Sequence, residues 1–148
     1  MNEKRTVMKM RIGAVIGPDH ETIVPLPDGP IIRVRDTENN VTADYPNPGY
    51  TAETHRRPTA AKALVAHHID VVLTVPGSFC SLSHKIARQG GITFWPVESG
   101  STWQEVGAQG EPPPEAVVDA LPLPELMKQN LASIKYYWNR RRHSSSSR

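Results

Sequence analysis

The first third of the chain alternates short apolar runs with polar turns. Residues 10–17 (MRIGAVIG) form an apolar, β-branched run that ends in Gly-Pro, which predicts a buried strand. We expect a short second strand over residues 22–26 and a third over 30–35 (PIIRVR), while VTADY at 41–45 returns after the turn-rich TENN. Because these segments follow one another closely, antiparallel pairing is the expected connection.

The pattern then changes to an alternation of helices and strands. Residues 58–67 (PTAAKALVAH) begin with a proline, which suits a first helical position, and carry one apolar face. That face consists of Ala61, Leu64 and Val65. The continuous apolar run DVVLTV at 70–75 is typical of a parallel strand that is covered on both faces.

A second helix is expected over residues 78–89. Ser78 is a good N-cap, and a glycine pair follows the last predicted turn. The apolar stripe of this helix would consist of Phe79, Leu82 and Ile86.

One more strand and one more helix complete the predicted domain. ITFWPV at 92–97 predicts a strand, and residues 99–108 predict a short helix capped by Ser101. Three β segments are therefore followed by the order α-β-α-β-α, which predicts an α/β fold with a mixed sheet. The strands at 10–17, 70–75 and 92–97 should be parallel neighbours.

Composition divides the chain into four parts. We expect a leader over residues 1–9, one domain over 10–110, a proline-rich linker over 111–122 and a C-terminal segment over 123–148. The last segment predicts an amphipathic helix followed by a basic Ser/Arg tail. Its apolar positions are spaced by three or four residues: Leu123, Met127, Leu131, Ile134 and Trp138.

Charge and cysteine content limit the classes of function. The net charge of the 148-residue chain is only +2, so nothing in the overall balance points to nucleic acid or to a membrane surface. A single cysteine excludes an internal disulfide framework and suits a reducing compartment. The apolar run near the N-terminus is too short for a signal sequence or a membrane span, so we expect a cytoplasmic protein.

Cys80 and His84 are four residues apart in the predicted helix over 78–89. As the second helical residue, Cys80 would lie near free N–H groups that favour a thiolate. His84 would lie one turn later on the same flank, away from the Phe79 stripe. Both are suitable iron or zinc ligands, but two ligands do not close a tetrahedral site. We therefore expect them to bind a preformed cluster that brings its own sulfides, or a metal shared with another chain. The alternative is a partly buried thiol beside a surface histidine.

Other basic side chains offer a second set of candidates. His55, Arg56 and Arg57 precede the first predicted helix, where they could meet an anionic cluster through charge-assisted hydrogen bonds. The alternative is a solvated basic loop. His67 and His68 diverge by about 100° on a helix, so they predict a structural role, with His68 ending the helix in the left-handed region.

Two stretches resemble a known family. RIGAVIGPDHETIVPLPDGPIIRVRD at 11–36 and ALVAHHIDVVLTVPGSFCSLSHKIARQGGITFWPVESGSTWQEV at 63–106 are similar to the dinitrogenase iron–molybdenum cofactor biosynthesis family, the NifX-like and NafY-like domain also found at the C-terminus of NifB proteins. The chain departs from the family at 26–29, where LPDG replaces a segment with His-Phe-Gly. The resemblance implies an RNase H-like three-layer fold, with a mixed five-stranded sheet and helices on both faces.

The resemblance also implies a function. It suggests a non-enzymatic carrier or chaperone that transiently binds an iron–sulfur or iron–molybdenum cluster, with cofactor-assembly proteins or an apo-nitrogenase-like acceptor as partners and a homodimer as an open option. Cys80, His84, His55, Arg56 and Arg57 are the site residues that we expect. The main alternative is a protein-interaction or regulatory module of the same fold without a metal site. A nuclease is disfavoured because the first strand contains no carboxylate.

Overall fold

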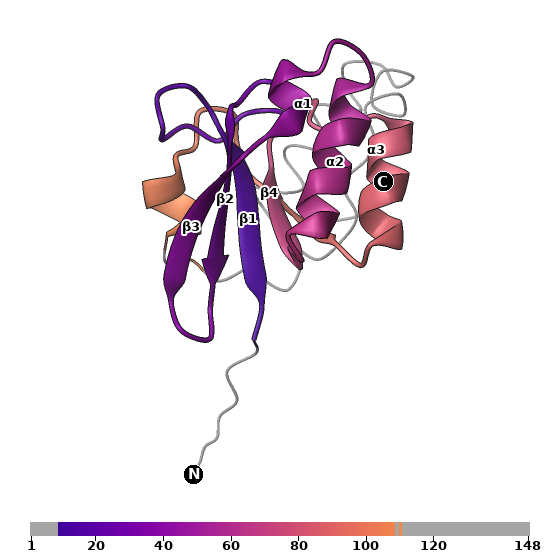
Figure 1. Ribbon diagram of the computed structural model, residues 1–148. Helices are drawn as coiled ribbons and strands as arrows, with labels where there is room; N and C mark the ends of the chain where they lie inside the picture. Colours follow the sequence, from indigo (N-terminus) through magenta and orange to yellow (C-terminus); the bar gives the residue numbers. More distant parts are fainter. Residues whose placement is uncertain (1–8, 109, 111–148) are drawn as a thin grey trace, which may run out of the picture.

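The computed structural model describes residues 9–108 and 110, and within them one five-stranded sheet forms the centre of the molecule (Figure 1). The strands follow the predicted segments closely. They are β1 (Arg11–Ile16), β2 (Ile31–Asp36), β3 (Val41–Pro46), β4 (Val71–Thr74) and β5 (Thr93–Pro96).

The sheet is mixed, with the strand order β3-β2-β1-β4-β5. β1 pairs antiparallel with β2, and β2 pairs antiparallel with β3. β1 pairs parallel with β4, and β4 pairs parallel with β5. The predicted α/β class, the mixed five-stranded sheet and the three parallel neighbours are therefore confirmed.

The two faces of the sheet are covered differently. α2 (Arg56–Ala66) and α3 (Ser81–Gln89) lie side by side over one face, and the short α1 (Pro48–Thr51) precedes them (Figure 1). This first face contributes Val15, Val72 and Phe94 to a core that includes Leu64 of α2. The second face forms another core, in which Ile12, Leu73 and Trp95 join Trp103 of the short π-helical turn η1 (Trp103–Gly107).

Two predictions near prolines are wrong: one strand is absent, and one helix starts at another residue. No strand forms over residues 22–26, where isolated bridges join Ile23 to Ile16 and Thr22 to Thr102. Pro25 and Pro27 lack the N–H group that a ladder needs, which limits pairing to this point. α2 begins two residues before the predicted start, at Arg56, so Pro58 occupies its third position, where a missing N–H is still tolerated.

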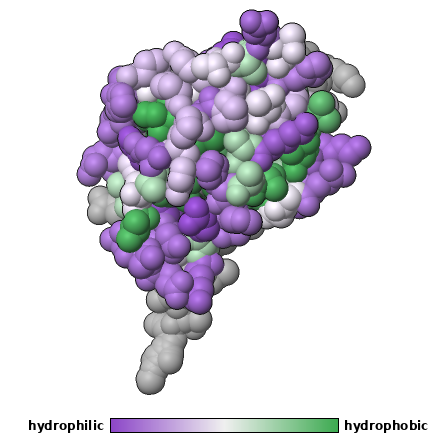
Figure 2. Space-filling model, viewed as in Figure 1, coloured by the Kyte–Doolittle hydropathy of each residue, from purple (hydrophilic) through white to green (hydrophobic). Residues whose placement is uncertain are grey.

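The start of α3 also differs from the prediction. Ser78 is not the N-cap, because its Oγ donates to the Val75 carbonyl at 2.8 Å, and the helix starts at Ser81 with Cys80 as its N-cap. The predicted apolar stripe is wrong at Leu82, which is 50% exposed, while Ser83 and Ala87 face the core. Leu82 and the partly buried aliphatic side chains of α2 and α3 therefore give the helical layer some exposed apolar surface. Figure 2 shows hydrophobic surface on the side of the molecule where these helices lie.

The last predicted helix is a five-residue π-helical turn capped by Thr102 rather than by Ser101. Thr102 Oγ1 accepts the Glu105 N–H at 3.2 Å, and Glu105 Oε1 accepts the Thr102 N–H at 3.0 Å. This reciprocal pair is a capping box. The predicted linker (111–122), the C-terminal segment (123–148) and nearly all of the leader lie outside the described residues. None of the described helices is long and apolar enough to cross a membrane.

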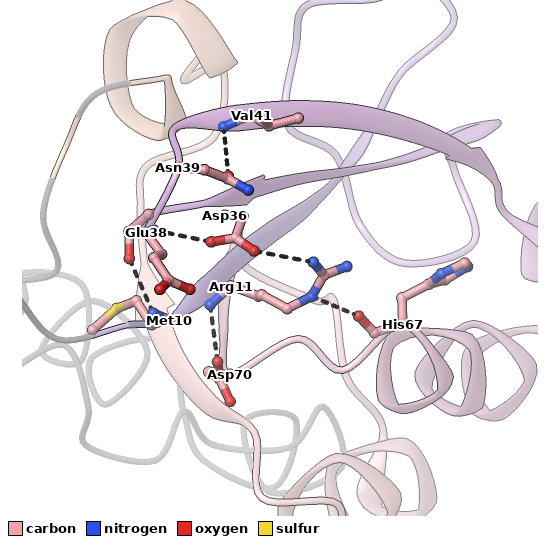
Figure 3. Close-up of polar contacts among 9 residues, drawn as sticks. Met10, Arg11, Asp36, Glu38, Asn39, Val41, His67 and Asp70 are labelled. Atoms are coloured by element: carbon pink, nitrogen blue, oxygen red, sulfur yellow. Dashed lines mark hydrogen bonds and ion pairs between the residues drawn. The ribbon is translucent and has the colours of Figure 1, made fainter.

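Arg11 connects several elements at the edge of the sheet where β1 starts (Figure 3). Its N–H donates to Asp70 Oδ2 at 2.9 Å, and its Nε donates to the His67 carbonyl at 3.0 Å. Its guanidinium also pairs with Asp36 at 3.7 Å. The end of α2, the start of β4 and the end of β2 are therefore tied to β1.

Asn47 also connects separate elements, at the opposite edge of the sheet, where β1 ends. Its side-chain amide is buried, donates to the Leu26 and Gly29 carbonyls at 2.8 and 2.9 Å, and accepts the Gly49 N–H at 3.0 Å. One side chain thus connects the loop before β2 to the start of α1. The loops of this edge owe their shape to polar contacts as well as to apolar burial.

We expect Asn47→Ala to lower the free energy of unfolding by about 2–4 kcal/mol, because it leaves two buried carbonyls without their donor. The measurement is urea denaturation at neutral pH. Asn39→Ala is the matched control, since Asn39 is exposed and accepts only the Val41 N–H within the described chain. Equal losses for the two variants would contradict the anchoring role of Asn47.

Candidate functional site

The candidate site lies at the edge where the parallel strands end. β1 and β4 run in the same direction, and α2 and α3 run back against them, so both helices begin at this edge. Arg57 Nε donates to the Gly77 and Ser78 carbonyls, both at 3.1 Å, which joins the start of α2 to the loop between β4 and α3. The fold therefore brings His55, Arg56 and Arg57 to the same edge as Cys80.

Cys80 is a partly buried free thiol at the N-cap of α3. Its N–H donates to Ser83 Oγ at 2.8 Å, and its Sγ lies 3.2 Å from the same oxygen. Burial raises the pKa of the Cys80 thiol, but hydrogen bonds from the Ser83 hydroxyl and from the Ser83 and Leu82 N–H groups outweigh it, so the pKa falls below its ordinary value. The direction of this shift agrees with the expectation that N–H groups near the start of the helix favour a thiolate.

His84 occupies a different place from the one predicted. Its ring stacks on Phe94 with centroids 4.9 Å apart and meets Phe79 edge-on at 6.3 Å, and its Nε2 is buried. The expectation that His84 lies on a flank away from Phe79 is therefore wrong. The imidazole packs against the aromatic side chains of Phe79 and Phe94 instead. A ligand role for His84 stays a prediction.

His55 is exposed and forms the N-cap of α2 in the left-handed region, at φ 52°. Its side chain does not cap the helix, and its Nδ1 lies 3.3 Å from Thr54 Oγ1. The first turn of α2 then carries two arginines and no acidic residue. Cations at a helix N-terminus oppose the helix dipole at a cost of about 0.3–1 kcal/mol each, and a bound anion would remove this conflict.

The two arginines differ in how their guanidinium groups are used. Arg56 donates to three carbonyls, those of Gly49, Pro27 and Tyr50, so it serves mainly to hold loops together. Arg57 uses only Nε, and no acceptor among residues 9–108 and 110 binds its two terminal nitrogens. Of the two, Arg57 is therefore the better placed to bind an anion.

A bare metal ion does not fit these residues. Within the part of the chain that the structure describes, no group of three or more His, Cys, Asp or Glu side chains could hold one.

His67 stacks on Tyr45 with centroids 4.2 Å apart, and His68 ends α2 in the left-handed region at φ 57°. The predicted left-handed conformation of His68 at the end of the helix is confirmed.

Sequence reasoning missed Ser83, the residue that most directly affects the thiol. Its Oγ accepts the Cys80 N–H, and its own N–H donates to the Cys80 sulfur, so Cys80 and Ser83 form a capping box in which sulfur replaces the usual hydroxyl. The signal was the spacing of three residues between two capping side chains. Ser78 concealed it because serine is the more common N-cap.

Comparisons with known proteins add information about the fold. No family model and no curated protein matches the chain. The chain is similar to the apo form of the orange protein from Desulfovibrio gigas, with a TM-score of 0.55 and 20% identity over 66% of this chain and 82% of that one. It is also similar to a Thermotoga protein of the DUF35 family, provisionally called a NifB protein, with a TM-score of 0.52 and 16% identity over 67% and 85% of the two chains. Identities this low show a shared fold alone.

We expect Ser83→Ala to raise the pKa of the Cys80 thiol and to slow its alkylation by iodoacetamide at pH 7, because the variant removes a hydrogen bond to the thiolate. Alkylation rate against pH measures both effects. Ser78→Ala is the control, since that hydroxyl bonds Val75 instead of the thiol. An unchanged pKa in Ser83→Ala would show that the thiol is tuned by something else.

Proposed function

We propose that the protein binds a preformed, anionic metal–sulfur cluster as cargo and passes it to an acceptor, without catalysing a reaction. The observation that carries this proposal is the Cys80 thiol of lowered pKa at the edge where α2 and α3 begin. A thiolate is a good ligand for iron and other soft metals. The N–H groups that lower its pKa also favour negative charge at this place.

Arg57 supports the same proposal. Its Nε binds the Ser78 carbonyl, and Cys80 is two residues further along, a distance of at most about 7 Å for an extended chain. The terminal nitrogens of Arg57 can therefore donate charge-assisted hydrogen bonds to the sulfides of a cluster held by Cys80. His55, which is exposed at the same edge, is a candidate for a second ligand.

The small number of protein ligands favours a cluster over a single ion. A cluster that already carries sulfides needs only one or two protein ligands, whereas a structural ion needs about four. Attachment through one thiolate and a few hydrogen bonds also allows release. This balance suits transfer better than permanent storage.

The fold comparisons give limited support to the proposed binding of a cluster. One neighbour is described as an apo form, the term for a protein without its bound group, and the other is provisionally called a NifB protein. We infer that the fold is RNase H-like, because the order β3-β2-β1-β4-β5 with only β2 reversed relative to the other strands fits it. A cofactor-assembly protein in the cytoplasm is the partner that this proposal requires.

A second candidate function is a protein-interaction module without a cluster. Leu82 favours it, because a leucine that is 50% exposed in the first turn of α3 gives a partner an apolar contact. The two functions are compatible, since an acceptor must approach Cys80. Only the first function requires the thiol.

We expect Cys80→Ser to reduce retention of a cluster at least tenfold, because serine keeps the size of the side chain but provides no thiolate. The chain is mixed anaerobically with a synthetic thiolate-ligated [4Fe–4S] cluster and separated by gel filtration, and iron and sulfide are measured in the protein fraction. Arg57→Gln should weaken retention roughly fivefold to tenfold, since Arg57 is partly exposed. Lys62→Gln, which removes an exposed charge from the middle of α2, is the control.

Further variants separate binding from folding. His55→Ala should lower retention without changing the melting temperature, because the side chain is exposed. His84→Ala should lower the melting temperature, because the ring packs on Phe94. Equal retention in wild type and Cys80→Ser would exclude the carrier function and leave the interaction module.

A further inference from the structure

The second face of the sheet is covered less completely by the described residues than the first. α2 and α3 contribute 11 and 9 residues to the cover of the first face. Over the second face, the helical cover within residues 9–108 and 110 is the five-residue turn η1, which packs mainly against β1. A sheet of this kind is about 19 Å wide and a helix covers about 10 Å of it. The half of the second face formed by β4 and β5 therefore needs a further layer.

The side chains of that half are nevertheless buried. Leu73 and Trp95 are 2% and 8% exposed, and Val71, Val75 and Val97 are also buried. All five side chains are apolar, and they belong to the second core. Their burial requires an apolar cover over β4 and β5, to which Trp103 and Ala108 of the described chain contribute.

The described chain ends directly over this surface. Gly110 lies so close to Trp95 that a Cβ atom on it would be 2.9 Å from the ring. Its carbonyl accepts a hydrogen bond from Arg35, whose Nε also binds the Gly107 carbonyl at 2.8 Å. Arg35 is buried, so these two bonds hold the chain firmly to the second face.

We propose that the apolar stripe of residues 123–138 covers the β4–β5 half of the second face. The sequence predicts a helix there, and 15 or 16 residues would form a helix about 23 Å long and 10 Å wide, the size of the missing layer. The stripe of leucine, methionine, isoleucine and tryptophan matches the five apolar side chains. The outer surface of α2 and α3 is a poorer partner, because Lys62, Lys85 and Arg88 would repel the basic end of the same segment.

The test measures the exposure of Trp95 by hydroxyl-radical footprinting of the full chain. The variant Leu131→Asp/Ile134→Asp places two charges in the stripe, and we expect the oxidation rate of Trp95 to rise at least threefold. Gln129→Asp/Ser133→Asp adds the same charge outside the stripe and should leave the rate unchanged. Trp103 reports on the fold, since it belongs to η1, which packs against β1, and its side chain should stay buried in both variants.

Several outcomes would overturn the proposal. An unchanged Trp95 rate in the stripe variant, or fast oxidation of Trp95 in wild type, would show that residues 123–138 do not cover this face. Protection that increases with protein concentration would identify a second copy of the chain as the cover instead. If the stripe variant unfolds, shown by rapid oxidation of Trp103 as well, the wild-type rate measured from 1 to 100 µM decides between these occupants. Cluster retention does not enter, so the result is independent of the proposed function.

Discussion

The parallel pairing of β1 with β4 is the constraint on which the rest of the structure depends. It aligns Ile12 with Val71 and Gly13 with Val72, and it obliges the chain to return along one face of the sheet through α2 before β4 can form. β5 adds to β4 in the same direction, so α3 must return in the same way. Both helices therefore begin at one edge, and Arg57 at the start of α2 bonds the loop that leads to Cys80.

Several residues at this edge are unfavourable for the stability of the helices that they start. Cysteine is a weaker N-cap than serine, because sulfur is a weak hydrogen-bond acceptor. His55 occupies the N-cap of α2 in a strained left-handed conformation, and two arginines oppose the dipole of the same helix. Such local conflicts gather at functional sites, where binding compensates for them. On the proposed function, a negatively charged cluster would offset the unfavourable charge of the two arginines and would use the Cys80 thiolate as a ligand.

The two faces of the sheet differ in what they position and bury. The helical layer positions the thiol and exposes Leu82, whereas the second face buries Leu73 and Trp95 near the point where the described chain ends at Gly110. A partner that collects a cluster from Cys80 would approach the edge and the helical layer. The C-terminal segment, on our proposal, lies on the other face and leaves that approach open.

Much of the fold was determined by local pattern. The alternation of short apolar runs located all five strands, the period of α2 located its buried face, and His68 was correctly placed at the end of that helix. The candidate residues could also be selected from the sequence, because Cys80, His55 and the arginines differ chemically from their surroundings. The environment of each was decided by tertiary structure. Ser78 is the more common type of N-cap, but its hydroxyl bonds Val75 and Cys80 caps α3 instead. Leu82 is exposed and His84 faces the sheet, the reverse of what was expected. The side of α3 that is buried depends on the position of Phe94 in β5, and the spacing of residues within α3 does not reveal that position.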